Sequence, residues 1–223
     1  MATTLKPVKQ DIKVAVDNVI VTVKDGELFV LLIQMSKSPY KGMWALPGGL
    51  VEQKETLENA AGRFLKKQTS VSNVYLEQLY TFSDISRDPA GRVITCAYFA
   101  LVPPDKYELQ TNPKYADAQW WNIKKLPALA YDHEQIVKYG KKRLQWKLEY
   151  TNVAWSLLPK EFTMSDLQEV YESILGESLD KRNFRKKIVE QKMIRPTGKK
   201  AMRGAHRPAE LFTFRSKVAK IIA

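Results

Sequence analysis

Two hydrophobic patterns alternate along the chain, and each predicts one kind of secondary structure. Apolar runs rich in β-branched and aromatic residues predict strands at 12–23, 28–35, 74–83, 93–102 and 118–123. The segment Lys24-Asp25-Gly26-Glu27 separates the first two runs, and its Asp-Gly pair favours a tight hairpin. Clustered Pro, Gly and polar residues predict loops at 38–49 and 85–92.

A helical period interrupts the strands from Thr56 to Gln68. Apolar residues recur there at i, i+3, i+4, i+7 and i+8, which together form one helix face: Leu57, Ala60, Ala61, Phe64 and Leu65. Thr56 is the predicted N-cap. A second helix is predicted after Asp132, its expected N-cap, and runs to about Trp146. Helices interleaved with strands predict an α+β or α/β/α first domain at 1–150.

The pattern changes after residue 150. The remaining chain predicts, in order, a helix, a short turn, a basic helix, a basic glycine-containing segment and a strand, at 162–175, 176–178, 180–194, 195–208 and 210–215. Ser165 and Gln168 form a predicted capping box in the first helix, and Asp180 is the candidate cap of the second. This order is that of a winged helix-turn-helix. The fold class is therefore predicted to be α+β, with a second domain at 151–223.

The net charge of +12 is confined to the end of the chain. Residues 181–223 hold fourteen of the 36 Lys and Arg residues and two of the 24 Asp and Glu residues. The first 180 residues therefore hold 22 residues of each sign and are neutral. Such a block of positive charge is typical of a protein that binds a polyanion, which is nucleic acid or an anionic membrane. We favour nucleic acid.

Cysteine and histidine are too scarce for several classes of protein. One cysteine, Cys96, excludes an internal disulfide framework, and its apolar surroundings predict a small buried side chain. Two histidines, His133 and His206, make a Cys/His zinc site an unfavoured interpretation. The sequence has no run of about 18 apolar residues that could cross a membrane and no stretch resembling a signal peptide. A cytoplasmic protein without a membrane partner is expected.

The segment GLVEQKETLENAAGRFLKKQTSV at 49–71, preceded by GMWALPG, carries a more specific pattern. It resembles the Nudix box, Gly-x5-Glu-x7-Arg-Glu-aliphatic-x-Glu-Glu-x-Gly-aliphatic. The matching positions are Gly49, Glu55, Arg63, Leu65 and Val71. The resemblance places the catalytic Glu of the motif at Phe64, its metal-binding Glu pair at Lys67 and Gln68, and its late Gly at Ser70.

These replacements remove the chemistry of diphosphate hydrolysis. That reaction needs a divalent cation held by carboxylates. Residues at i, i+3 and i+4 share one helix face, and here that face carries an aromatic ring, an ammonium and an amide. The surviving carboxylates lie on the loop and first turn and hold one metal weakly at best: Glu52, Glu55 and Glu58. We therefore predict no catalytic residue, no metal and no cofactor, and expect Glu55 to pair with Arg63 at the loop–helix corner.

The second domain extends the resemblance. A Nudix-like domain followed by LPKEFTMSDLQEVYESILGESLDKRNFRKKI is similar to the Nudix-related transcriptional regulators of the NrtR type. Three further segments agree with that family: SRDPAGRVITCAYFALV, PALAYDHEQIV and RGAHRPAELF. The resemblance implies a Nudix-like α/β/α sandwich with a mixed sheet and a homodimeric repressor of operator DNA. It also implies an effector, which is ADP-ribose or a related nucleotide, or a pentose in a second branch of such regulators.

The basic helix and the segment after it supply the candidate DNA-binding residues. An Arg side chain can recognise guanine and an Asn side chain adenine, while Lys and Arg also contact phosphates. The candidates in the helix are Lys181, Arg182, Asn183, Arg185 and Lys186, and those in the wing are Lys199, Lys200, Arg203 and Arg207. Phe184 and Ile188 are one turn apart and are expected to face the core.

The resemblance also implies an effector pocket, formed by the box and the loop at 85–92. The candidate residues are Trp44, Gly48, Gly49, Glu52, Glu55, Arg87, Asp88 and Arg92. Arginine can hold a phosphate through two hydrogen bonds. Trp44 is equally suited to core packing, and Asp88 could belong to a tight turn. Met35 occupies a position that is basic in many Nudix-type chains, and His133 is expected to have a structural or interface role.

Three functions remain open at this point. The first is a transcriptional repressor with a nucleotide or sugar effector. The second is a weak Nudix-type hydrolase with a nucleic-acid-binding tail, which predicts metal-dependent turnover. The third is an RNA-binding adaptor, which predicts no preference for duplex DNA with dyad symmetry.

Overall fold

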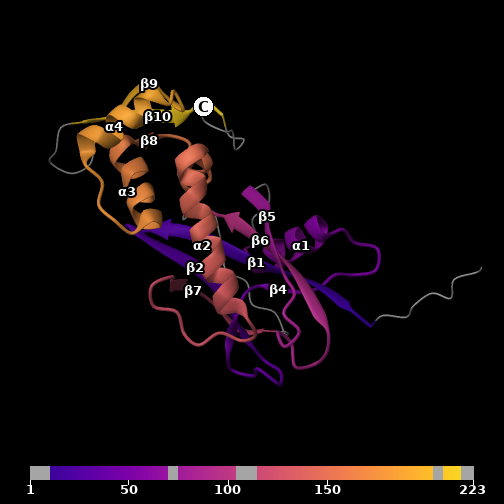
Figure 1. Cartoon of the computed structure of the whole chain (residues 1–223). Coiled ribbons are helices and arrows are strands. Elements are labelled where there is room, and N and C mark those ends of the chain that lie inside the picture. Colours follow the sequence, from indigo (N-terminus) through magenta and orange to yellow (C-terminus); the bar gives the residue numbers. More distant parts are fainter. Residues whose placement is uncertain (1–10, 70–74, 104–114, 203–207, 217–223) are drawn as a thin grey trace, which may run out of the picture.

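A twisted seven-stranded sheet forms the first part of the computed structural model, which describes residues 11–69, 75–103, 115–202 and 208–216 (Figure 1). The strands are β1 (Lys13–Lys24), β2 (Glu27–Met35), β3 (Trp44–Ala45), β4 (Gly48–Leu50), β5 (Tyr75–Phe82), β6 (Val93–Leu101) and β7 (Tyr115–Asn122). Their order is β3-β2-β1-β6-β5, with β4 paired to β1 and β7 to β2. β1 and β6 run parallel while the other pairs run antiparallel, so the predicted mixed sheet is confirmed.

The alternation of side chains along β1 decides which helix covers which face. The buried Asn18 donates from Nδ2 to the carbonyl oxygen of Ala61 in α1 (Leu57–Thr69), at 2.9 Å. The next residue, Val19, lies against Gly140 of α2 (His133–Tyr150). Because successive residues of a strand point to opposite faces, α1 and α2 lie on opposite sides of the sheet. Asp17 therefore points to the same side as Val19.

The hairpin between β1 and β2 forms as predicted. Asp25 and Gly26 both have positive φ angles, 49° and 71°, which a two-residue turn matched to the strand twist requires. The tip of this hairpin reaches the winged helix, where a side chain at Gly26 would contact Glu169 of α3 (Met164–Leu175).

The second part of the structure is the predicted winged helix. After η1 (Val153–Leu157), the three-stranded sheet has the order β8-β10-β9 and is formed by β8 (Phe162–Thr163), β9 (Ile194–Ala201) and β10 (Ala209–Phe214). α3 packs against this sheet, and α4 (Lys181–Glu190) packs against α3. Phe184 and Ile188 of α4 are buried as predicted, and the Phe184 ring meets the Tyr171 ring at 5.1 Å.

The caps of three helices test the sequence predictions. Thr56 Oγ1 accepts a hydrogen bond from the Asn59 amide at 3.2 Å, which confirms the predicted cap. The capping box predicted at Ser165 and Gln168 is wrong, because β8 ends at Thr163 and the box is formed by Thr163 and Asp166. Asp180 caps α4 as predicted, by accepting from the Asn183 amide.

Asp132 differs from its predicted role. It precedes α2, but its side chain makes no capping hydrogen bond, because its carboxylate is bound to Arg87. α2 also continues to Tyr150, four residues beyond the predicted end.

Among the described residues, none of the helices has both the length and the apolar character that a membrane span requires.

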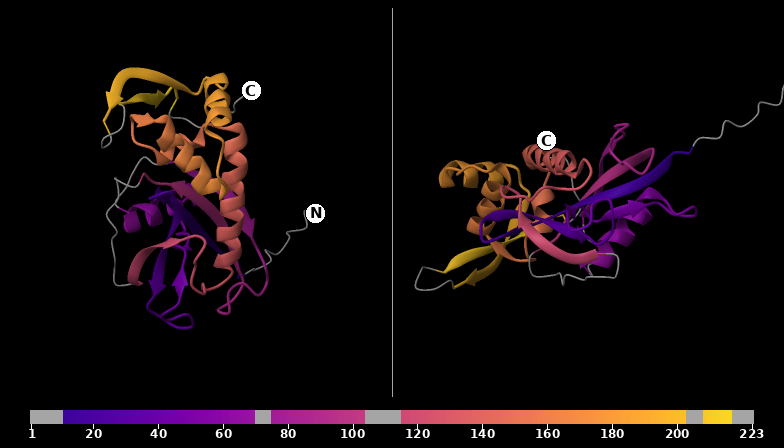
Figure 2. Two further views of the ribbon diagram at one scale, coloured as in Figure 1. Left: turned by 90° about the vertical axis from the view of Figure 1, so that its left-hand side faces the viewer. Right: turned by 90° about the horizontal axis from the view of Figure 1, so that it is seen from below.

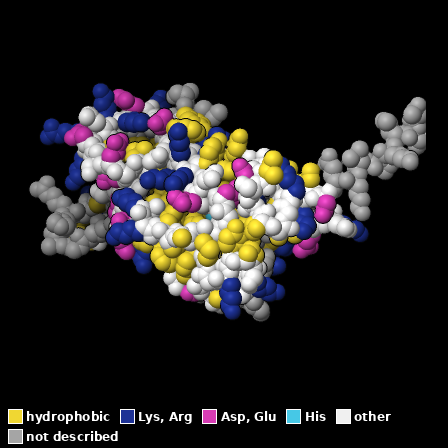
Figure 3. Space-filling view, turned by 60° about the horizontal axis from the view of Figure 1, so that its bottom comes forward, with side chains coloured by type: hydrophobic (Ala, Val, Ile, Leu, Met, Phe, Trp, Pro, Cys, Tyr) yellow, Lys and Arg dark blue, Asp and Glu magenta, His cyan; other side chains and the backbone are white. Residues whose placement is uncertain are grey.

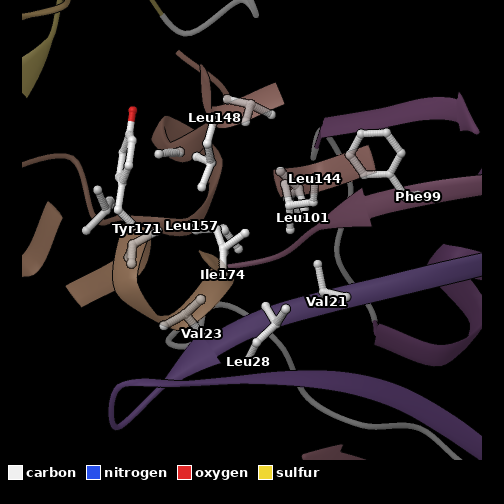
Figure 4. Packing of buried hydrophobic residues seen from close by; sticks show 14 of the residues in the cluster. Val21, Val23, Leu28, Phe99, Leu101, Leu144, Leu148, Leu157, Tyr171 and Ile174 are labelled. Carbon is white, nitrogen blue, oxygen red and sulfur yellow. The ribbon is translucent and has the colours of Figure 1, made fainter. Parts of the chain in front are cut away.

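One hydrophobic cluster joins the two parts of the molecule. Val21, Val23 and Leu28 from the sheet pack with Leu144 and Leu148 of α2 (Figure 4). The same cluster continues into the winged helix through Leu157, Leu167, Tyr171, Ile174 and Phe212. α2 spans both parts along the length of the molecule (Figure 2, left). The division proposed at residue 150 therefore falls at the end of α2, and side chains of this helix belong to a cluster that includes both the sheet and the winged helix.

Candidate functional site

A cavity of about 280 Å³ opens on the α2 side of the sheet. Its walls come from β1, β2, the segment from β3 to β4, the loop at 85–92 and the start of α2. The lining residues are Lys13, Ala15, Asp17, Ile33, Met35, Ala45, Leu46, Gly48, Gly49, Leu50, Arg87, Asp88, Ala90, Val93, Tyr131 and His133. The cavity is mostly apolar, with polar groups gathered at β1, the loop and α2.

Four of the eight predicted pocket residues line this cavity: Gly48, Gly49, Arg87 and Asp88. The other four do not. Trp44 packs edge-on against Trp121, with ring centroids 5.3 Å apart. Arg92 donates from Nη1 to the carbonyl oxygens of Ser83 and Asp84 and so closes its own loop. Glu52 and Glu55 lie beside Arg63.

A buried cluster of charges forms the polar wall of the cavity. Arg87 donates from Nε and Nη2 to both carboxylate oxygens of Asp132, at 3.0 and 2.8 Å, and from Nη2 to Asp17 Oδ2 at 3.2 Å. The side chains of Arg87, Asp17 and Asp132 are 3%, 8% and 9% exposed. Burial would raise the pKa of Asp17, but interactions with His133 and Arg87 outweigh it and lower the pKa below 3.8. Asp17 is therefore ionised at neutral pH.

Asp17 lines the cavity but is not among the pocket residues predicted from the sequence. It stands as the one charged residue within the apolar run from Val14 to Val23, and a charge in such a run marks a buried ion pair. That observation could have found Asp17, but not its partners Arg87 and His133, which lie 70 and 116 residues away along the chain.

His133 and Tyr131 complete the wall at the start of α2. His133 Nδ1 accepts from the Leu46 amide at 2.9 Å, so the ring proton lies on Nε2, which is 3.5 Å from Asp17 Oδ1. Tyr131 has a positive φ of 55° and its ring packs against Tyr40 at 4.4 Å and His133 at 5.1 Å. Burial raises the pKa of the Tyr131 hydroxyl, so this group is a hydrogen-bond donor at neutral pH.

Gly48 allows β4 to lie close to β1 beside the cavity. A Cβ atom at Gly48 would be 2.3 Å from the Val16 carbonyl oxygen and 2.5 Å from Asp17 Oδ1. We expect Gly48→Ala to lower the free energy of unfolding by about 1–3 kcal/mol, because the two strands must separate. Urea unfolding measures this. Gly62→Ala is the control: nothing lies within 4 Å of its added methyl group, and removing a helical glycine should stabilise α1 by about 0.5–1 kcal/mol. Equal effects of the two changes would contradict the close-approach argument.

The Nudix-like box has become part of the structural core. Phe64 is 5% exposed and packs with Val16, Cys96 and Tyr98, and Cys96 is buried as predicted. Lys67 is exposed. Within the described residues, no group of three or more His, Cys, Asp and Glu side chains is arranged to hold a metal ion. Of the motif's carboxylate positions, Phe64 thus packs α1 against the sheet, while Lys67 faces solvent.

The predicted ion pair between Glu55 and Arg63 is confirmed. Arg63 donates from Nε and Nη2 to the two carboxylate oxygens of Glu55, at 2.7 and 2.6 Å. The Glu55 carboxylate also accepts from the Glu52 amide at 3.2 Å. The pair therefore ties the loop after β4 to α1.

This pair makes part of the stability depend on pH. The hydrogen bond from Arg63 lowers the pKa of Glu55 from 4.5 to about 2. A carboxylate with a lowered pKa in the folded state stabilises it above the unfolded pKa, and this stabilisation is lost as the pH falls from 4.5 towards 2. We expect Glu55→Gln to lower the melting temperature at pH 7 and to have a smaller effect at pH 3. A difference between wild type and variant that grows with acidity would contradict the assigned pair.

The polar surface of α4 faces away from the core. Lys181, Arg182, Asn183, Arg185 and Lys186 are all exposed. In the upper left of Figure 3, Lys and Arg side chains are spread over the surface with Asp and Glu side chains among them. In the wing, Lys200 is exposed, while Lys199 pairs with Glu161 at 2.8 Å. The two other wing candidates, Arg203 and Arg207, lie outside the described residues.

Known protein families account for both parts of the chain. The NUDIX domain family matches residues 12–140, and the family described as the NrtR DNA-binding winged helix domain matches residues 154–214. The chain belongs to the NrtR-type regulators of the NUDIX family. The "ADPR responsive transcriptional repressor NtrR" of Acinetobacter baylyi is 37% identical over 203 residues, which cover 89% of this chain and 80% of that protein.

Two solved structures are similar to this NrtR-type chain. Shewanella oneidensis NrtR complexed with a 27mer DNA is 34% identical, with a TM-score of 0.81 over 91% of this chain and 93% of that one. The NUDIX domain of Shewanella oneidensis NrtR complexed with ADP ribose is 35% identical, with a TM-score of 0.55 over 61% of this chain and 90% of that one. The NrtR-type fold therefore covers both the cavity and the exposed face of α4.

Proposed function

We propose that this NrtR-type protein represses transcription by binding operator DNA through α4 and the wing, and that ADP-ribose or a related nucleotide in the cavity controls this binding. The observation that carries the proposal is α4. It buries Phe184 and Ile188 and exposes Lys, Arg and Asn side chains on the N-terminal half, as a helix in the major groove does. The DNA complex of Shewanella oneidensis NrtR supports it.

The cavity is proposed to bind its effector without hydrolysing it. Phe64 stands at the catalytic position of the motif and its ring is packed in the core, where it can neither hold a metal nor activate water. Lys67 places an ammonium where a metal-binding carboxylate would stand. A sensor that leaves its ligand intact keeps reporting the concentration of that ligand.

ADP-ribose is the proposed effector. The Acinetobacter baylyi repressor is described as ADPR responsive, and the related NUDIX domain was solved with ADP ribose. The cavity offers an apolar floor with a few convergent polar groups, which is usual for sites of small organic ligands. The eight residues predicted from the sequence remain candidates. The four that line the cavity, together with Lys13, Tyr131 and His133, are the ones we propose to contact ligand.

A homodimer is the proposed binding unit, because two winged helices on a symmetric operator give a small domain enough specificity. Selection from a random duplex pool tests this, followed by fluorescence anisotropy with the selected site, with and without ADP-ribose. We expect a site with dyad symmetry whose affinity changes with ADP-ribose. An absence of preference for duplex DNA with dyad symmetry would favour an RNA-binding adaptor. A change of operator affinity with a pentose and not with ADP-ribose would identify the effector as a sugar.

Chromatography of ADP-ribose incubated with the protein and Mg²⁺ or Mn²⁺ tests the absence of hydrolysis, because cleavage of the diphosphate linkage would give AMP and ribose 5-phosphate. We expect the rate of hydrolysis with protein and metal to equal the rate in the same buffer without protein. Turnover at about 1 per second or faster, an ordinary enzymatic rate, would overturn the sensor and favour the hydrolase.

A further inference from the structure

Arg87 lies at the junction between the cavity and α2. It lines the cavity, and it holds both carboxylate oxygens of Asp132, the residue directly before α2. Asp17, on the rigid strand β1, is a second anionic partner of the same guanidinium. If Asp132 moved away, Asp17 would still neutralise Arg87. The guanidinium can therefore exchange one of its anions without becoming an unpaired buried charge, which would be costly.

Asp132 also has an alternative partner of its own. A carboxylate directly before a helix ordinarily accepts hydrogen bonds from the first backbone amides of that helix. In this structure the Asp132 side chain makes no such bond, because Arg87 occupies it. Release from Arg87 would let Asp132 cap α2. The two arrangements of Asp132 exclude each other, which is the requirement for a two-state element.

The backbone before α2 is held in a strained conformation. Tyr131 has a φ of 55°, in the left-handed region that residues other than glycine rarely adopt. The neighbouring contacts hold it in place: the Ala130 amide donates to the Trp44 carbonyl oxygen at 2.8 Å, and His133 accepts from Leu46. A change at Arg87–Asp132 would therefore act on a segment that has strain to release.

The other end of α2 holds the turn before the DNA-binding helix. Gln145 donates from Nε2 to the carbonyl oxygens of Ile174 and Leu175, at 3.0 and 3.2 Å, in the last turn of α3. The turn that follows is fixed to α3 by Glu172, whose carboxylate accepts from the Leu179 amide at 2.8 Å. Residue 180 then caps α4. About 20 Å of continuous helix, at 1.5 Å per residue, connects Asp132 to Gln145.

We propose that the Arg87–Asp132 ion pair is a ligand-operated switch, in which an anionic group of the effector takes Arg87 from Asp132 and α2 transmits the change to the turn before α4. The inference rests on the proposed function. A phosphate is the fitting chemical group, since it accepts two parallel hydrogen bonds from arginine as the Asp132 carboxylate does. Binding shifts the equilibrium because the effector contacts Arg87 better when Asp132 has left.

Asp132→Asn in the full-length protein tests the switch. The asparagine keeps the shape but loses the charge that competes with the effector. We expect ADP-ribose to bind several-fold more tightly, as measured by calorimetry. Without ligand, the operator affinity of the variant should approach the affinity that the wild type has at saturating ADP-ribose. The ratio of operator affinities with and without ADP-ribose, commonly 5–150-fold for coupled sites, should fall to about twofold or less.

Two further variants separate the switch from a structural role. Glu134→Gln removes a carboxylate two residues from Asp132. Glu134 pairs with the exposed Lys138 and not with Arg87, so this change should leave the affinities for ADP-ribose and operator DNA unchanged. Gln145→Ala removes the contact with α3 and should reduce the operator response while leaving ADP-ribose affinity unchanged. If Asp132 had only a structural role, Asp132→Asn would lower the affinity of the protein for both ADP-ribose and operator DNA.

The outcomes distinguish the switch from the proposed function. A wild-type protein whose operator affinity does not respond to ADP-ribose overturns both. A wild-type response that Asp132→Asn retains in full, or an Asp132→Asn variant that binds ADP-ribose more weakly, overturns the switch alone. Tighter ADP-ribose binding together with a lost response supports it.

Discussion

Arg185→Glu is expected to lower the affinity for operator DNA by about a hundredfold or more. Arg185 is exposed on the N-terminal half of α4, one residue after the buried Phe184. Loss of a two-hydrogen-bond contact to a base costs about 1–3 kcal/mol, and a carboxylate at the same place also repels the phosphates. Fluorescence anisotropy with the selected operator at fixed salt measures the effect.

The control for this change is Lys66→Glu. It alters the net charge by the same amount, on an exposed position of α1, and α1 lies on the opposite side of the sheet from α2. Operator affinity should change little, and both variants should keep the wild-type melting temperature to within a few degrees. Equal losses of affinity from the two variants would mean that net charge, not α4, determines binding.

Leu148→Ala is expected to destabilise both parts of the molecule together. Leu148 is buried near the end of α2 and belongs to the hydrophobic cluster that runs from the sheet to the winged helix (Figure 4). Truncation of a buried leucine costs about 2–5 kcal/mol. In a chain of this size each kcal/mol lowers the melting temperature by about 2–4 °C. Scanning calorimetry should show one transition that moves down as a whole.

Glu149→Ala is the matched control, because it is the next residue of α2 and is exposed. Its effect should lie within about 0.5 kcal/mol of zero, as for most surface changes. Two separate transitions, of which Leu148→Ala moves one, would show that residues 1–150 and 151–223 unfold independently. The shared core would then not couple the cavity to the DNA-binding surface.

The retained frame of the Nudix-like box has a structural explanation. Glu55 and Arg63 hold the loop against α1, and Phe64 fills the space between α1 and the sheet. Gly48 allows β4 to approach β1 at the cavity. Gly48 lines the cavity, while the other three positions hold α1 and its loop against the sheet, and none of these roles needs a metal, so the frame can remain when the carboxylates are replaced.

The sequence by itself determined the features that depend on local order. Apolar runs rich in β-branched and aromatic residues located the main strands, and a period of 3.6 residues located the helix after Thr56. The Asp25-Gly26 turn, the caps at Thr56 and Asp180, and the buried face of α4 followed from neighbouring residues alone. The block of positive charge located the proposed DNA-binding surface for the same reason.

Only the tertiary structure decided what depends on residues far apart in the chain. Asp132 was expected to cap α2, but a strand and a loop bring Asp17 and Arg87 to it, and a buried guanidinium binds a carboxylate more strongly than exposed amides do. β8 moved the start of α3 by pairing with β10. Trp44, Glu52, Glu55 and Arg92 came from the right segments, but each makes contacts outside the cavity. Local sequence offers a side chain several possible partners, and packing between distant segments determines which of them it meets. At this cavity Asp132 therefore belongs to a buried ion-pair cluster and does not cap α2.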